Sequence, residues 1–485
     1  MTYSWRKGGQ SGGGYCNAIA TDPYTSSVIA CGDVWGFARS DDAGRSWYPT
    51  NEGQTPGAPY GRCAAFSQKH PGRAYVGVGT LKYQNPSGGG YLGMIDPALG
   101  SPYMLARANT TISFTSYLPT GGAGDVPRPC GRLIAVDYDQ VSGIEYLYLL
   151  TRQGLMRSTD GGMTVTPLGL PAPAPLYAWS AVCLLATGDL LISSFRTSPT
   201  GGSRLWKVSQ PRTSAAVSEV TGIHGLPPVI EDIASVLISG THVYLLACGP
   251  YGLIRYNGTP LLPADAELHL SSVTQDAAGV LWTGNGVGAD DHRCVARSMD
   301  GGQSWQWATP AAACLPTIYG TQRRWWLADA WSAMSKGSGY SVSQLAVGGT
   351  GIVYSAGRAG VHSTHDAGQT WAPTCDGLDG SEANAFTSDG ATVWASDTDY
   401  HSSASQDGFA NATQDSQPPA FPAPSLTRGN VKVTTTNPPQ ILVNGVDQAD
   451  DYARSALTNP KDVYADAQGR IYIALSGGVL VGDPT

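Results

Sequence analysis

Three tryptophans and two arginines crowd into one short segment of this chain, as Arg323, Arg324, Trp325, Trp326 and Trp331. Indole rings stack on the apolar faces of sugar rings, while a few convergent polar groups take the sugar hydroxyls. The segment is therefore a candidate glycan-binding loop. The alternative is that its tryptophans pack a long loop onto its own domain.

Two further short segments combine a carboxylate with an aromatic ring. Asp33 and Trp35 lie in segment 31–37, and Asp399 precedes Tyr400 in segment 397–401. Asp33 is the first candidate for a functional carboxylate. Trp35 and Tyr400 extend the expected glycan-binding surface, to which Tyr83 and Tyr251 are further additions.

Other catalytic and metal-binding patterns are weak. A sialidase would grip a substrate carboxylate with three arginines and use a Tyr–Glu pair as nucleophile. Arg152, Arg196 and Arg358 are available, but no glutamate has a convincing place beside a tyrosine. The histidines lack the spacing of metal ligands, and Asp397-x-Asp399 alone is typical of a turn. We expect no metal and no cofactor.

Composition indicates many short strands joined by tight turns. Glycine accounts for 62 of 485 residues, and only 14% of residues are charged. The net charge of -8 gives no basic surface for nucleic acid, and no apolar run is long enough to span a membrane. Nine cysteines without a Cys-x-x-Cys pair do not indicate a disulfide framework.

A recurring motif must position these residues. It reads Gly-apolar-x-Arg-Ser followed by x-Asp-x-Gly-x-Ser/Thr-Trp, and it returns with Asp42, Asp160, Asp300 and Asp366. A decayed copy surrounds Asp407. The aspartate accepts from backbone N–H groups of a tight turn, the glycine supplies a positive φ, and the hydroxyl adds a local bond. These aspartates are therefore structural.

The motif resembles the Asp boxes of the bacterial neuraminidase repeat. A chain with several such boxes is similar to the β-propellers of sialidases, sortilin-like receptors and family 74 glycoside hydrolases. In such a propeller the box turns lie on one face. The loops between the second and third strands of each blade, and between successive blades, lie on the other, so function is expected there.

The repeats predict an all-β fold with one large β-propeller over residues 1–485. Apolar, strand-like runs recur in about seven to nine four-stranded blades. The last unit ends after three strands, and 3–6 has no sheet of its own. The N-terminal strand is therefore expected to complete the last blade. Insertions are expected near 101–128, 315–341 and 415–457.

The N-terminal segment carries a narrower resemblance. The runs Tyr3-Ser4-Trp5-Arg6-Lys7 and Gly32-Asp33-Val34-Trp35-Gly36-Phe37 look like the opening of a family 74 glycoside hydrolase of the xyloglucanase type. The resemblance implies that Asp33 is one of two carboxylates of an inverting hydrolysis. Those enzymes pair two propellers, whereas this chain is expected to form one. Candidates for the second carboxylate are Asp291 and Asp399, with Asp125, Asp290, Asp329 and Asp397 behind them.

Three functions follow in order of preference. The first is a propeller that recognises a polysaccharide or a bacterial surface glycan. The second is an inverting endo-glycoside hydrolase with Asp33 as one carboxylate, and the third is a non-enzymatic assembly scaffold. The N-terminus has no apolar signal segment. Propellers with such boxes mostly act outside the cytoplasm, so either a signal peptide has been removed or the protein leaves the cell without one, as a virion component does. We expect an extracellular or virion-associated protein, such as a phage-tail receptor-binding protein, with other virion proteins as further partners.

Overall fold

A computed structural model of the chain describes a defined set of residues. They are 2–8, 16–32, 36–50, 60–79, 91–99, 105–109, 132–151, 153–171, 177–196, 203–221, 227, 229–249, 251–264, 269–285, 295–307, 342–357, 360–369, 371–374, 385–396, 402–406, 413–414, 422–436, 438–457, 460–475 and 478–485.

The described residues form ten four-stranded antiparallel sheets. In nine of them the four strands follow one another along the chain, while the tenth has the order β1-β40-β39-β38. The expected all-β fold is confirmed. The described part also contains one short helix, α3 (Asp451–Ala456), and a 3-10 turn, η1 (Pro97–Leu99).

Seven sheets, numbered here in chain order, belong together. The first is β2 (Cys16–Thr21), β3 (Val28–Gly32), β4 (Phe37–Ser40) and β5 (Tyr48–Pro49); the second is β6 (Tyr60–Phe66), β7 (Ala74–Gly79), β8 (Tyr91–Ile95) and β9 (Leu105–Asn109). The third is β10 (Ile134–Asp139), β11 (Ile144–Thr151), β12 (Gly154–Ser158) and β13 (Thr166–Pro171); the fourth is β14 (Tyr177–Leu184), β15 (Leu190–Arg196), β16 (Arg204–Ser209) and β17 (Ala216–Glu219).

The remaining three complete the set. The fifth is β18 (Asp232–Ile238), β19 (Thr241–Ala247), β20 (Leu253–Arg255) and β21 (Pro260–Leu262). The sixth is β22 (Leu270–Gln275), β23 (Leu281–Asn285), β24 (Val295–Ser298) and β25 (Gln306–Trp307). The seventh is β26 (Val342–Val347), β27 (Val353–Gly357), β28 (Gly360–Thr364) and β29 (Ala372–Pro373).

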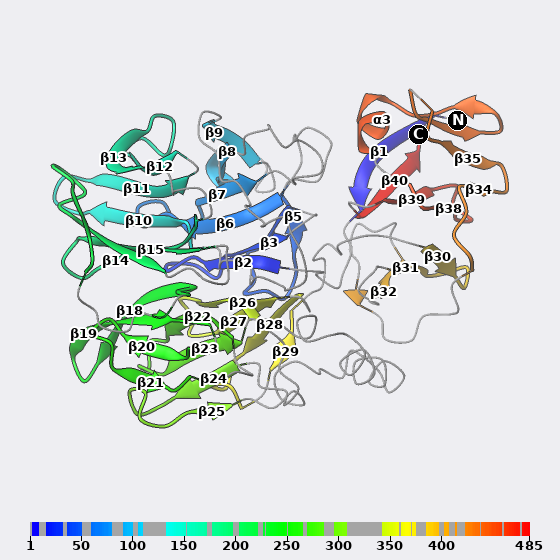
Figure 1. Ribbon diagram of the computed structural model, residues 1–485. Coiled ribbons are helices and arrows are strands. Elements are labelled where there is room, and N and C mark those ends of the chain that lie inside the picture. The colour runs from blue at the N-terminus through cyan, green and yellow to red at the C-terminus, as the bar shows by residue number, and fades with distance from the viewer. Residues whose placement is uncertain are drawn as a thin grey trace.

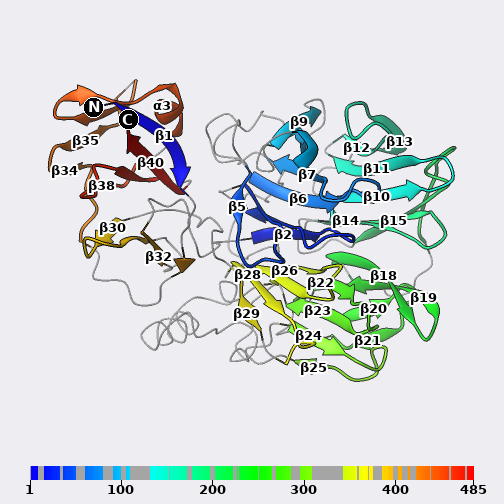
Figure 2. The ribbon, with the colours of Figure 1, turned by 180° about the vertical axis from the view of Figure 1, so that it is seen from behind.

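The first strands of these seven sheets surround a common axis. β2, β6, β10, β14, β18, β22 and β26 pack side by side in that order, and β26 packs against β2. These seven sheets gather into one body in both views of the ribbon (Figures 1 and 2). Seven radial sheets closed in this way form a β-propeller, which we call the ring.

Side chains close the ring between its first and seventh sheets. The backbone N–H of Ile19 donates to Oε1 of Gln344 at 3.1 Å. The indole N–H of Trp47 donates to the carbonyl of Thr374 at 2.6 Å. Between these bonds, buried apolar residues of both sheets form one cluster that includes Tyr354. No strand is exchanged between the two sheets, so the packing of two complete sheets holds the closure.

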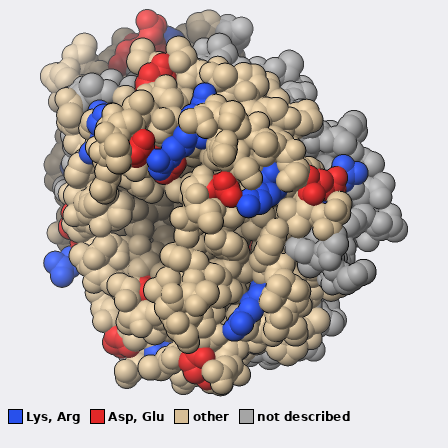
Figure 3. Space-filling view, turned by 90° about the vertical axis from the view of Figure 1, so that its left-hand side faces the viewer, with Lys and Arg blue, Asp and Glu red and all other residues tan. Residues whose placement is uncertain are grey.

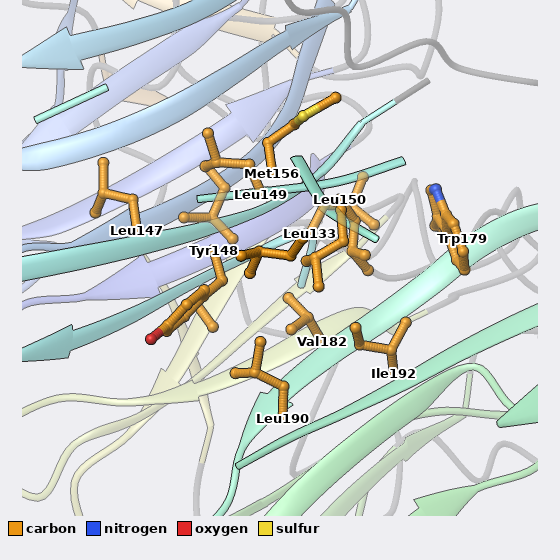
Figure 4. Packing of buried hydrophobic residues seen from close by; sticks show 14 of the residues in the cluster. Leu133, Leu147, Tyr148, Leu149, Leu150, Met156, Trp179, Val182, Leu190 and Ile192 are labelled. Atoms are coloured by element: carbon orange, nitrogen blue, oxygen red, sulfur yellow. The ribbon is translucent and has the colours of Figure 1, made fainter. Parts of the chain in front are cut away.

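Apolar side chains fill the space between neighbouring sheets. Figure 4 shows this for the third and fourth sheets, where Tyr148 and Leu150 point toward Val182 and Leu190. Tyr148 and Leu190 are fully buried. Because each sheet is covered on both faces, the side chains on both faces of a strand are often apolar, which gives runs of successive apolar residues.

Three further sheets form a second group, which we call the three-sheet stack. They are β30 (Ala385–Ser388), β31 (Val393–Ser396), β32 (Ser402–Ser405) and β33 (Thr413–Gln414); β34 (Thr427–Arg428), β35 (Val431–Thr434), β36 (Gln440–Val443) and β37 (Val446–Asp447); and β1 (Tyr3–Gly8), β40 (Gly478–Pro484), β39 (Ile471–Leu475) and β38 (Asp462–Ala465).

The sheet that contains both chain ends lies in the middle of the stack. Phe386 of β30 packs on one of its faces in a cluster with Tyr472. Val431 of β35 and Ala453 of α3 pack on the other, around Trp5. β1 pairs with β40 over its whole length, and the labelled chain ends lie together (Figure 1). The expected completion of the last sheet by the N-terminal strand is confirmed.

The division of the sheets differs from the expected single ring. Seven sheets lie within the expected range of seven to nine, and the last three stand apart as the stack. The segment 415–457, expected as an insertion, contains β34 to β37 and α3. Of the other two expected insertions, 315–341 lies outside the described residues, and only β9 is described within 101–128.

The repeated motif forms a self-satisfied turn between the third and fourth strands of a sheet. Asp42 accepts from the backbone N–H of Ser46 at 2.9 Å and from its hydroxyl at 2.6 Å. The hydroxyl of Ser40 donates to Asp42 at 2.8 Å and accepts from the N–H of Gly44 at 2.7 Å. Gly44 has a φ of 84°, a conformation that glycine adopts without strain.

The other copies repeat these contacts. Asp160 and Asp300 each accept from the residue four positions on, and Asp366 accepts from the Thr364 hydroxyl at 2.9 Å. The tryptophan that ends the motif also reaches the preceding sheet, because Trp305 donates to the carbonyl of Leu261 at 3.2 Å. The four aspartates therefore accept hydrogen bonds within their own turns.

The N-terminal strand is expected to stabilise the stack through Trp5. This side chain is 7% exposed, and its indole N–H donates to the carbonyl of Gln448 at 2.8 Å. We expect Trp5→Ala to lower the free energy of unfolding of the stack by about 3–5 kcal/mol, measured by calorimetry. Val446→Ala, at an exposed position of the same stack, is the control. Equal unfolding curves for the two variants would contradict this role.

The aspartate of a repeat turn is expected to lose its effect in acid. Burial raises the pKa of Asp42, but hydrogen bonds from Ser46 and Ser40 outweigh it and lower that pKa below its ordinary value. A lowered pKa stabilises the fold above the unfolded pKa of about 3.9, and this stability disappears as pH falls through the folded pKa.

We therefore expect Asp42→Ala to cost about 2 kcal/mol at neutral pH and clearly less near pH 2, as measured by denaturant unfolding. Arg45→Ala changes an exposed side chain of the same turn and is the matched control. A cost for Asp42→Ala that stays constant down to acid pH would show that the carboxylate charge is unimportant.

Candidate functional site

The two ends of the ring differ in the connections they carry. Neighbouring strands within each sheet are antiparallel, so the first and third strands end where the second and fourth begin. The repeat turns lie at this end, which we call the turn end. The opposite end, where the first strand of each sheet begins and the second strand ends, is the loop end.

The turn end is a poor candidate for a functional site. Figure 3 looks at the left-hand side of Figure 1, where β10 ends, and shows acidic and basic side chains interspersed on a mostly uncharged surface with a hollow. The carboxylates of its repeat turns are engaged by their own turns. A functional site is therefore better sought at the loop end.

Tyr251 lies among the described residues, whereas Tyr83 and the other residues predicted for the site lie outside them. These others are Asp33, Trp35, Asp291, Arg323, Arg324, Trp325, Trp326, Trp331, Asp399 and Tyr400. The strands that flank them are described. Their connections join β3 to β4, β23 to β24, β25 to β26 and β31 to β32, and the first three therefore leave from the loop end of the ring.

Backbone contacts on both sides hold the base of the connection that carries Asp33. The N–H of Gly32 donates to the carbonyl of Gly36 at 2.7 Å, which closes the hairpin on both sides of 33–35. Gly61 of the second sheet packs closely on Gly36, because a Cβ atom on Gly61 would overlap the carbonyl oxygen of Gly36. The carbonyl of Gly61 in turn accepts from the amide of Asn17 at 3.0 Å.

The hairpin that carries Asp399 has the same register as the hairpin that carries Asp33. Val28 pairs with Ser40 in β3 and β4, and Val393 pairs with Ser405 in β31 and β32, at the same sequence separation. The position of Asp33 corresponds to 398, between Asp397 and Asp399. The ring and the three-sheet stack thus each contain a matching hairpin with aspartate in its connection.

A buried carboxyl and an imidazole meet at the loop end of the fifth and sixth sheets. Glu231 precedes β18 and is completely buried, and His269 precedes β22. Nε2 of His269 lies 3.2 Å from Oε1 of Glu231. The backbone N–H of His269 donates to Oδ1 of Asn285 at 2.9 Å, where β23 ends.

The environment of Glu231 favours its protonated form. Burial raises the pKa of Glu231, while the hydrogen bond and the charge of His269 act in the opposite direction and Asp232 adds to the rise. A carboxyl of this kind takes up a proton at higher pH than an exposed one. The pair is therefore the described group at the loop end that comes nearest to an acid–base site.

An arginine crosses the axis of the ring beside this pair. Nε of Arg132 lies 3.2 Å from Oδ1 of the fully buried Asp232. Its Nη2 donates to the carbonyls of Val273 at 3.0 Å and Leu345 at 3.3 Å. Arg132 precedes the third sheet, so a single guanidinium links it to the fifth, sixth and seventh.

Sequence reasoning missed Glu231, His269, Arg132 and Asp232. Their shared signal is local: each is a charged or titratable residue at the start of the apolar inner strand of a sheet or within two residues before it. The tyrosine neighbour expected of a sialidase glutamate does not identify Glu231, because its partner is a histidine 38 residues further along the chain.

The described histidines and cysteines do not form a further site. Among the described residues, no three His, Cys, Asp or Glu side chains are grouped to hold a metal ion. His362 is buried within β28, and His365 lies 3.4 Å from the Ser363 hydroxyl at the turn end. The cysteines in the described segments are free thiols. No described helix is long and apolar enough to cross a bilayer.

Comparisons with known proteins bear on the fold alone. No protein-family model matches the chain, and no curated protein matches it significantly. The solved structures that resemble it include the GH74 xyloglucanase from Xanthomonas campestris, with 14% identity over 100% of both chains and a TM-score of 0.32. The GH74 enzyme of Niastella koreensis has 13% identity over 99% of both chains and a TM-score of 0.33.

A third likeness is to YCF48 bound to the D1 peptide, with 11% identity over 74% of this chain and 94% of that one and a TM-score of 0.45. Likenesses at this level assign no activity. The ring itself establishes the fold. It is a β-propeller.

The Arg132–Asp232 pair is expected to be important for stability. Arg132→Met leaves the Asp232 carboxylate buried without its cation, which typically costs about 3–5 kcal/mol. Arg204→Met removes an exposed pair with Glu219, whose atoms lie 3.9 Å apart, and should cost less than about 1 kcal/mol. Denaturant unfolding of both variants measures the difference. Equal costs would show that Arg132 does not neutralise Asp232.

Proposed function

We propose that this chain recognises a polysaccharide or a bacterial surface glycan at the loop end of its ring. One observation carries the proposal. The connections with Asp33, Asp291 and the 323–331 cluster leave from the loop end, while the repeat turns occupy the other. The aromatic and polar residues suited to sugars thus belong to connections that start from one end of the ring.

The chemistry of the 323–331 segment favours a glycan over a flat protein partner. Tryptophan rings supply apolar planes for pyranose rings, and neighbouring arginines supply several donors for hydroxyls. An assembly scaffold would instead use a broad apolar or charged face. The scaffold remains the third candidate.

A hydrolase of the inverting type is the second candidate, and a specific observation favours it. The β3–β4 and β31–β32 hairpins share one register and both carry aspartate in the connection. Two carboxylates about 6.5–9.5 Å apart can act as general acid and general base around a water molecule. Asp33 would supply one of them and Asp397 or Asp399 the other. This pairing agrees with the family 74 resemblance of the N-terminal segment.

We place this activity outside the cell or on a virion, as a proposal that rests on the repeat-turn resemblance. A propeller at a phage tail would meet a bacterial surface glycan directly. Other virion proteins would then be its structural partners.

Glycan binding is tested with immobilised β-glucans and bacterial wall and capsule polysaccharides. We expect the wild-type chain to bind part of this panel, and Trp325→Ala with Trp326→Ala to weaken binding by about tenfold or more, as loss of about 1.4 kcal/mol implies. Tyr24→Ala removes an exposed aromatic ring at the turn end and should leave binding unchanged. A wild-type chain that binds nothing in the panel would overturn the proposal.

Hydrolysis is tested by reducing-sugar release from the same polysaccharides. We expect Asp33→Asn and Asp399→Asn each to abolish release if the chain is an inverting hydrolase, because each carboxylate has a separate role. Asp451→Asn, at an exposed position on α3, is the control. Binding without release would reduce the chain to a recognition protein.

A further inference from the structure

The turn that follows β19 lies directly on the His269 ring. Gly249 exchanges backbone hydrogen bonds with Leu270, both at 3.0 Å. A Cβ atom on Gly249 would come within 2.9 Å of Cε1 of His269. The positive φ of Gly249, 56°, is a second reason for glycine here. The fifth sheet therefore fixes the position of the imidazole on the sixth.

An exposed aromatic ring stands on this same turn. Tyr251 is 43% exposed, and its N–H donates to the carbonyl of Cys248 at 3.0 Å. The N–H of Gly252 donates to Gly249 at 3.3 Å, which closes the turn. The other exposed large apolar side chains described in the ring lie toward the turn end, namely Tyr24, Val141, Ile144, Met163, Leu237 and Met299. Tyr251 is thus set apart at the loop end.

His269 retains one ring nitrogen for a ligand. Nε2 faces Glu231, and the backbone N–H is bound to Asn285. Within the described residues, Nδ1 has no hydrogen-bond partner, and the side chain is 12% exposed. The contact between Nε2 and the buried Glu231 holds the ring in this orientation.

We propose that Tyr251 and His269 form a sugar-binding subsite at the boundary of the fifth and sixth sheets, with Glu231 as a positioning residue. The ligand is a neutral pyranose unit of the polysaccharide. Its apolar face stacks on the Tyr251 ring, and one hydroxyl bonds to Nδ1 of His269. This inference rests on the proposed glycan recognition.

The charges around the subsite explain why the sugar is neutral. His269 is paired with Glu231, and the neighbouring Asp232 is paired with Arg132. A sialic or uronic acid needs a cation for its carboxylate, typically a bidentate arginine. The described groups around His269 provide two balanced pairs, so a neutral hexose is the better match.

The test measures affinity for the polysaccharides that the wild-type chain binds. We expect Tyr251→Ala and His269→Ala each to weaken binding by about tenfold, the loss of a stacking or hydrogen-bond contact of about 1.4 kcal/mol. Tyr24→Ala and His242→Ala are matched controls, because both side chains are exposed at the turn end. Tyr251 is exposed, so its variant will fold even where His269→Ala is destabilised.

Two variants of Glu231 test whether this residue positions His269 for binding or only supports the fold. Glu231→Gln keeps an acceptor for His269 and should retain affinity within about threefold, whereas Glu231→Ala should match His269→Ala at about tenfold. The double variant Glu231→Ala, His269→Ala should lose no more affinity than His269→Ala alone. A lower melting temperature with unchanged affinity would show that Glu231 only supports the fold.

Three results would overturn the subsite. The first is full affinity in Tyr251→Ala and His269→Ala while the wild-type chain binds; glycan recognition would then stand without this subsite. The second is strong preference for acidic polysaccharides that depends on His269. The third is a wild-type chain that binds no polysaccharide, which removes the proposed function together with the subsite.

Discussion

Buried polar links between inner strands are the constraint on which the ring depends. Asp232 accepts from the N–H of Val273 at 2.9 Å, and the hydroxyl of Ser272 accepts from the N–H of Leu345 at 3.0 Å. The links continue through the Gln344–Ile19 bond to the first sheet. Each one satisfies a buried backbone or side-chain group that would otherwise cost free energy. Apolar packing alone is compatible with several relative positions of two sheets, whereas each of these hydrogen bonds requires one particular partner on the neighbouring sheet.

The same links prepare the loop end for a ligand. Asp232 binds both a neighbouring strand and Arg132, and Glu231 stands directly before it. The side chains nearest the axis are therefore held by the bonds that hold the sheets together. A site on such a base loses little conformational entropy when it binds, since its groups are already ordered.

Local patterns in the sequence predict the sheets well and their grouping poorly. Apolar runs and the turns around Asp42, Asp160, Asp300 and Asp366 are encoded within a few residues, and so is the N-terminal strand at 3–8. The division between ring and stack depends on β26 packing against β2, a contact between distant segments that no local pattern marks. The Glu231–His269 pair likewise joins distant segments, so no local pattern predicts it. Asp33 and Trp325 lie outside the described residues, and their roles stay predictions.

The pairing of β1 with β40 gives the chain an unusual order of assembly. β1 is synthesised before the ring and its partner β40 after it, so the three-sheet stack cannot be completed until all seven sheets of the ring have been made. The ring requires only residues between those two strands and can close earlier. Throughout that interval β1 is an unpaired strand with open hydrogen-bonding edges, the kind of segment that invites chaperones or strands from other nascent chains.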